Sequence, residues 1–132
     1  MAEETTETPI VELTNAQYNE AKVLEIEAKQ KELEGKFKCQ IFPIALLNEN
    51  GGKITYVGYM KKPSLRFILS YTDKVIQSPA MANEMILENC IIKEESDPEI
   101  YTATDENSEN YLGALRVAES MVTYSKNHFK KK

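Results

Sequence analysis

The sequence predicts an α+β fold in which an N-terminal helix, a β-hairpin and a three-helix C-terminal bundle follow one another. Residues 13–35 have helical spacing, residues 36–60 contain two apolar runs around a turn cluster, and residues 61–129 contain two proline-started helices and a further amphipathic stretch. A chain of 132 residues is expected to form one domain. We place it at 13–129 and expect the acidic, threonine-rich residues 1–12 to be disordered.

The N-terminal helix opens with a capping signal. Thr14 and Gln17 have capping-box spacing, and Gly35 tolerates the left-handed conformation at which many helices end. Its apolar residues form one thin stripe among Glu, Lys and Gln: Ala16, Val23, Ile26 and Leu33. Such a stripe suits packing within the chain or against a partner, and periodicity does not distinguish the two.

The hairpin is predicted from two apolar runs, Phe37–Leu47 and Lys53–Met60, which flank the turn cluster Asn48–Gly52. Pro43 cannot donate a ladder hydrogen bond, so we expect it at an edge or a bulge. An isolated hairpin is marginally stable in water, and a helix or another strand is therefore expected to cover it.

Two helices begin at proline-serine signals, Pro63-Ser64 and Ser78-Pro79. The first is expected to bury the face formed by Leu65, Ile68, Leu69, Thr72 and Ile76. A second strip on the same helix, expected to be partly exposed, contains Phe67, Tyr71 and Val75.

A charged segment, Lys93–Glu99, follows and is expected to be a solvated acidic loop. Asp105 is placed to cap the last helix, whose buried stripe should run from Tyr111 to Val122. The expected element order is α-β-β-α-α-α.

Composition excludes several classes of protein. The net charge of −5 argues against nonspecific nucleic-acid binding, which needs a basic surface. No run approaches the roughly 20 apolar residues of a membrane span, and the acidic N-terminus does not resemble a secretory signal. Cys39 and Cys90 match no zinc or redox spacing, so we expect two small buried side chains in a reducing compartment.

The chain offers little for catalysis. Its single histidine, His128, lies near the C-terminus without a group to orient it as a general base. The acidic residues lack calcium-loop spacing, and no helix start follows Gly51-Gly52 as a phosphate loop would require. We therefore expect no catalytic residue, metal or cofactor. Lys61, Lys62 and Arg66 form a basic patch, which is either a solvated corner or a dock for an acidic segment.

One stretch carries a pattern of short motifs. A tyrosine, two lysines and a proline precede a helix, a second helix ends in Leu-Glu-Asn-Cys, and acidic residues follow. The residues concerned are Tyr59, Lys61, Lys62, Pro63, Asn83, Glu84, Ile86, Leu87, Glu88, Asn89, Cys90, Asp97, Glu99, Ile100 and Leu112. Over residues 40–128 this pattern resembles the small tail assembly chaperones of long-tailed bacteriophages. The helix at 13–35 is not part of that pattern.

The resemblance implies a non-enzymatic chaperone that works in the host cytoplasm and keeps the apolar, helical tape measure protein soluble. From the side-chain pattern we expect the partner-binding surface to contain Lys61, Lys62, Phe67, Tyr71, Met81, Met85 and Ile92. An alternative is a structural accessory protein of the virion, in the capsid or the tail. A small hydrolase or transferase is a third hypothesis, which the lack of a nucleophile–base pair disfavours. Association with further copies of the chain stays open.

Overall fold

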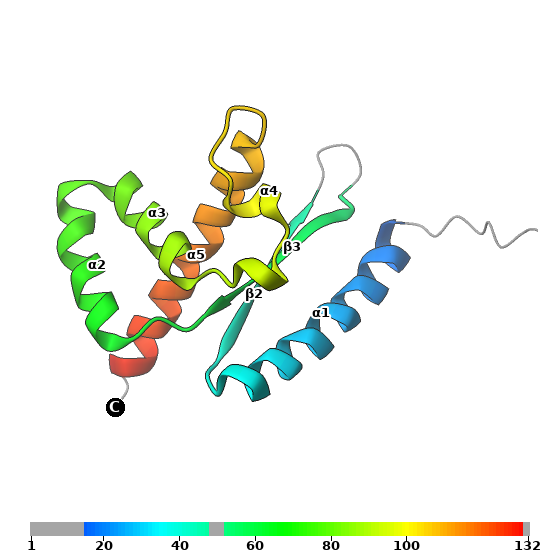
Figure 1. The fold of residues 1–132 in the computed structure, drawn as a ribbon, viewed down its shortest axis with the longest axis horizontal. Coiled ribbons are helices and arrows are strands. Elements are labelled where there is room, and N and C mark those ends of the chain that lie inside the picture. The colour runs from blue at the N-terminus through cyan, green and yellow to red at the C-terminus, as the bar shows by residue number, and fades with distance from the viewer. Residues whose placement is uncertain (1–14, 48–51, 131–132) are drawn as a thin grey trace, which may run out of the picture.

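The computed structural model describes residues 15–47 and 52–130, with side chains at 16–47 and 52–125 (Figure 1). Its elements are α1 (Asn15–Phe37), β2 (Ile41–Leu47), β3 (Ile54–Lys61), α2 (Leu65–Gln77), α3 (Pro79–Cys90), the 3₁₀ helix η1 (Lys93–Glu95), α4 (Pro98–Tyr101) and α5 (Ser108–Lys130). The α+β fold is confirmed, with the helix, the hairpin and the helical part in the predicted order. The expected disorder of residues 1–12, the Thr14 cap and the turn at 48–51 lie outside the described residues, as does the side chain of His128.

The antiparallel hairpin of β2 and β3 is the middle layer of the molecule, and both of its faces are apolar. On one face, Ile44 and Met60 join a core with α3, α4 and α5. On the other face, Ile41 and Tyr59 join a second core beneath α1. Figure 1 shows this arrangement, with α1 on one side of the strands and the remaining helices on the other. Helix α1 on one face and the remaining helices on the other therefore stabilise a hairpin that would be only marginally stable alone.

Helix α1 packs within the chain, which decides between the two alternatives that its sequence allowed. Leu33 is fully buried and Ile26 nearly so, both against the hairpin. Polar side chains fix the position of α1 as well. Asn19 donates to the carbonyl of Gly52 at 2.6 Å and accepts from the N–H of Ile54 at 2.8 Å.

The predicted end of α1 was wrong by two residues. The helix continues past Gly35, which is exposed, and ends at Phe37, whose ring packs against the second core. The left-handed conformation falls on Lys38, with φ of 57°, whose N–H donates to the carbonyl of Glu34 at 2.8 Å. The contact of Phe37 with the hairpin therefore decides the boundary, rather than the preference of glycine.

The predicted solvated loop at Lys93–Glu99 is instead a cover for the outer edge of β3. Val57 donates its N–H to the Asp97 carboxylate at 2.8 Å, and its carbonyl accepts from the N–H of Asp97 at 3.0 Å. One pair further along, the N–H of Tyr59 donates to Ser96 Oγ at 3.0 Å and its carbonyl accepts from Ile92 at 2.9 Å. These bonds satisfy strand groups that would otherwise form a free edge.

The opposite edge, along β2, is partly covered by α1. The N–H of Ile41 donates to the Glu34 carboxylate at 3.2 Å, and its carbonyl accepts from the Gln30 amide at 2.8 Å. Pro43 pairs with Tyr59, whose N–H and carbonyl both point away from β2. By the alternation of an antiparallel ladder, Pro43 therefore removes an outward N–H from this edge, as expected for an edge proline.

The helical layer has α3 in contact with both α2 and α5. Ser64 caps α2, its hydroxyl accepting from the N–H of Phe67, and Ser78 with Pro79 begins α3. The predicted cap at Asp105 was wrong, because residues 105–107 form a turn and α5 begins at Ser108. The predicted buried stripe on α5 is confirmed at Ala114, Ala118, Met121 and Val122, whereas Tyr111, its expected first residue, is only half-buried against the core.

Candidate protein-binding surface

Helix α2 has two apolar faces, and the described part of the chain covers only one of them. Ile68 and Tyr71 are buried, at 4% and 5% exposure. Leu65, Leu69 and Ile76 are exposed to 52%, 60% and 80%. The prediction of which face is buried was therefore wrong for these three side chains. Tyr71, expected on a partly exposed strip, belongs to the core, where its hydroxyl donates to Asn83 at 3.2 Å.

The physical reason is that α3 packs on the side of α2 that carries the aromatic residues. Phe67 and Val75 are half-buried on this side and pack against the main core. Either apolar strip of α2 would satisfy helical periodicity, so the larger side chains decide, since an aromatic residue buries more area than leucine. In Figure 1 the far side of α2 lies at the margin of the molecule.

The exposed face is regular, and it forms what we call the α2 seam: Leu65, Leu69, Thr72 and Ile76. Its members are separated by four, three and four residues, which is the spacing of a coiled-coil contact. The hydroxyl of Thr72 donates to the carbonyl of Ile68 at 2.9 Å, so it stays satisfied if the seam is covered. Two exposed charged side chains, Arg66 and Asp73, lie next to the seam and line an open recess with Leu65 and Leu69.

The other predicted partner-binding residues are distributed between surface and core. Met81, at the start of α3, is exposed to 54%. Met85 is half-buried against the main core. Ile92 is 3% exposed, because it belongs to the segment that covers β3, so its expected place on the surface was wrong. Sequence reasoning missed Leu65, Leu69 and Ile76, although their coiled-coil spacing was a signal that could have identified them.

The predicted basic patch is not one site. Lys61 and Lys62 line a recess together with Phe67, and the Lys61 ammonium lies 4.6 Å from the centre of the Phe37 ring. Arg66 instead lines the separate recess beside the α2 seam. The three cations therefore do not converge on one acidic ligand.

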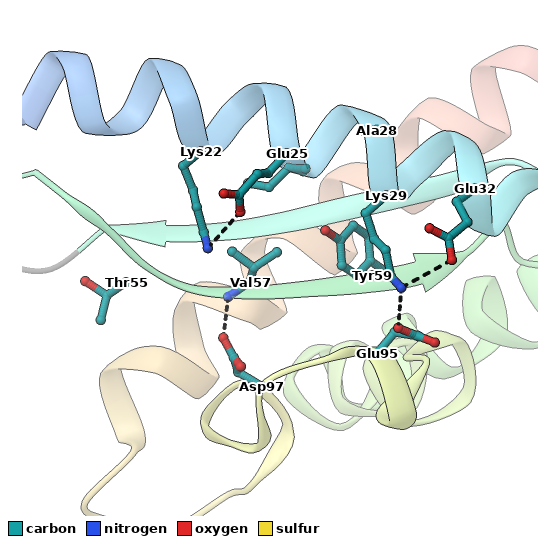
Figure 2. Close-up of a pocket in the computed structure, with 11 residues that line it drawn as sticks. Lys22, Glu25, Ala28, Lys29, Glu32, Thr55, Val57, Tyr59, Glu95 and Asp97 are labelled. Atoms are coloured by element: carbon teal, nitrogen blue, oxygen red, sulfur yellow. Dashed lines mark hydrogen bonds and ion pairs between the residues drawn. The ribbon is translucent and has the colours of Figure 1, made fainter.

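An open groove of about 520 Å³ lies between α1 and the covered edge of β3 (Figure 2). The groove is lined by Tyr59 and by charged side chains of both signs: Lys22, Lys29, Glu25, Glu32, Glu95 and Asp97. Figure 2 shows the Lys29 ammonium reaching down from α1 toward Glu95, at 2.9 Å, with Glu32 at 3.5 Å on its other side.

The charged side chains of this groove interact with one another or with the backbone of β3. The hydrogen bond between Lys29 and Glu95 raises the pKa of Lys29 and lowers the pKa of Glu95. Burial raises the pKa of the Tyr59 phenol, so this group stays protonated near neutral pH. Asp97 is held by the N–H of Val57. The groove thus fastens α1 to the cover of β3 and presents no nucleophile with a base beside it.

The two cysteines differ in burial. Burial raises the pKa of the Cys90 thiol to about 12, and Lys61 offsets this only in part, so it is a thiol at neutral pH. Cys39 is half-buried rather than buried as predicted, and both cysteines are free. Within residues 15–47 and 52–130 no three His, Cys, Asp or Glu side chains are grouped as metal ligands, and no helix has the length and apolarity to cross a membrane.

The sequence matches no protein family model and no curated protein, and the fold matches no solved structure. The arrangement of side chains therefore carries the functional argument alone. Among the described surfaces, the α2 seam is the one that combines exposed apolar side chains with regular spacing.

Proposed function

We propose that this protein is a non-enzymatic assembly chaperone of the phage tail type, which binds apolar helical segments of a tape measure protein. The observation that carries the proposal is the α2 seam, where Leu65, Leu69 and Ile76 are each more than half exposed. Covering such side chains with an apolar helix would be favourable, by roughly 25 cal/mol for each Å² of apolar surface removed from water.

The seam suits a helix better than an extended peptide. Its four positions follow the spacing that a partner helix can match with residues of the same period. Met81, exposed at the start of α3, adds a flexible side chain that adapts to varied apolar partners. Charged residues beside the seam and the net charge of −5 would help to keep a complex with an apolar client in solution.

Coexpression with the tape measure protein encoded in the same genome tests this function. The wild-type chain is expected to copurify with the tape measure protein and to increase its soluble fraction. Leu69→Asp should abolish both effects, because it places a charge at the centre of the seam. Leu24→Asp is the matched control, since Leu24 is 65% exposed on α1, away from the hairpin, and should leave both effects intact.

Two results would contradict the proposal: no gain in solubility with the wild-type chain, or an equal loss with the two variants. Mass spectrometry of purified virions separates the chaperone from an accessory virion component. A chaperone should be missing from mature particles, whereas a structural component should be present in a fixed ratio to the tail or capsid proteins.

A further inference from the structure

We propose that, without a client, the α2 seam is covered by the α2 seam of a second copy of this chain, in an antiparallel homodimer. The four seam residues occupy alternating core positions of a heptad, and reversing the direction of one helix aligns them with themselves. In this register Leu65 lies opposite the partner's Ile76, and Leu69 lies opposite the partner's Thr72. A two-fold axis then passes between positions 70 and 71, as a closed, symmetric dimer requires.

Charge complementarity identifies the occupant as a second copy. Arg66 and Asp73 are seven residues apart and lie on the same side of the seam. In the antiparallel register, Arg66 of each copy lies beside the partner's Asp73, and the pair is formed twice. Both side chains are exposed on α2, so they are accessible to a partner helix that covers the seam.

The helix dipoles favour the same register. Arg66 lies in the first turn of α2, where the positive end of its own helix disfavours a cation. An antiparallel partner brings its C-terminal turn, the negative end of its dipole, close to Arg66. A parallel pair would instead place the two Arg66 side chains on opposite sides of the seam, away from the partner's Asp73, so the charges select the antiparallel arrangement.

The seam is short, and the dimer should be transient. Each copy contributes a helix of 13 residues, about 20 Å long. A contact of this length falls at the low end of specific interfaces, so we expect dissociation constants in the roughly micromolar range. A contact of this strength can protect the seam and still yield it to a client. The exchange with a client rests on the proposed function, whereas the dimer itself does not.

Charge reversal followed by sedimentation equilibrium, from about 1 to 500 μM protein, tests the dimer. Arg66→Asp and Asp73→Arg should each weaken self-association about tenfold, because each places like charges together twice. A mixture of the two variants should associate more tightly than either variant alone, since opposite charges then meet at both positions. Combining both changes in one chain should restore the dissociation constant to within about threefold of the wild type.

Glu20→Lys, on the exposed surface of α1, is the control for net charge and should leave self-association unchanged. Circular dichroism confirms that each variant is folded. The proposal is overturned by a wild-type chain that is monomeric throughout, by a dimer that neither charge reversal weakens, or by a mixture with no preference for the mixed pair. A monomeric chain that still needs Leu69 to capture the tape measure protein would remove the dimer and leave the proposed function intact. A chain that forms the dimer but captures no client would remove the proposed function and leave the dimer intact.

Discussion

Helices α1 and α2 differ in how much of their apolar surface is buried within the chain. The apolar stripe of α1 is thin, yet its key residues Ile26 and Leu33 are buried against the hairpin. The apolar surface of α2 is broad, yet the outer half of it, from Leu65 to Ile76, is left in solvent. The amount of apolar sequence on a helix therefore does not determine how much of that helix the same chain covers.

The difference lies in what each helix meets. Polar side chains position α1 on the hairpin: Asn19 near the turn, Gln30 and Glu34 at the edge of β2, and Lys29 at the cover of β3. The bonds of Asn19, Gln30 and Glu34 go to backbone groups of the hairpin, and Lys29 pairs with the Glu95 carboxylate, so together they specify one docking position. The main neighbour of α2 is α3, on its aromatic side, and among the described elements nothing buries its other side.

Replacing one leucine on each of the two helices gives the largest expected contrast. Leu33→Ala should lower the free energy of unfolding by about 2–4 kcal/mol, because Leu33 is fully buried and its loss leaves a cavity. Leu69→Ala should change it by less than about 0.5 kcal/mol at a concentration where the chain is monomeric. Urea unfolding of both variants measures this. Similar losses would mean that the seam is covered within the chain and that the comparison is wrong.

A substitution of the glycine in β3 tests whether residues 92–97 pack tightly on this strand as part of the fold. A Cβ added at Gly58 would lie 3.0 Å from Ile100 Cδ1 and 3.2 Å from Ser96 Oγ. Gly58→Ala should therefore cost about 1–3 kcal/mol of stability through overpacking. Gly35→Ala is the matched control, because a Cβ added there would meet no atom within 4 Å and the position is helical, so stability should be unchanged or slightly higher. An unchanged Gly58→Ala variant would contradict tight packing of the segment on β3.

Which parts of this architecture could be predicted from the sequence follows from the range of the interactions involved. The elements were predictable because proline, serine and turn residues mark their boundaries locally, as at Ser64 and Ser78. The cover over β3 was not, because the bonds from Asp97 and Ser96 join residues 37 to 40 positions apart. The buried face of α2 was predicted wrongly, since both of its strips have helical spacing and α3 packs on the strip that carries the aromatic residues.

Asn19 tests whether polar contacts specify the docking of α1. Asn19→Ala removes one bond to the Gly52 carbonyl and one from the Ile54 N–H, and should destabilise the fold by about 1–2 kcal/mol. Asn19→Asp keeps the acceptor for Ile54 and loses the donor for Gly52, so an intermediate loss is expected. Hydrogen exchange of the Ile54 amide gives a local readout, and it should accelerate more in the alanine variant. Equal exchange in all three proteins would show that the apolar stripe alone positions α1.

The ion pair between Lys29 and Glu95 should have the smallest effect, and its sign is set by the direction of the two pKa shifts. The pKa of Glu95 is lower in the folded chain than its ordinary value of 4.5, so the contribution of Glu95 is complete above pH 4.5 and is lost as the pH falls through the folded value. Lys29, whose pKa is raised, contributes fully below its ordinary value of 10.5 and loses that contribution as the pH rises through its folded value.

Carbon-detected NMR titration of the Glu95 carboxyl measures the downward shift of its pKa. Lys29→Met should move the pKa of Glu95 upward, whereas Lys31→Met, on the exposed surface of the same helix, should not move it. Because both partners remain in contact with solvent, this pair orients α1 over the covered edge and adds little to stability. Leu33 and Asn19 are therefore the residues that distinguish α1, which is docked on the hairpin, from α2, which has an exposed apolar face.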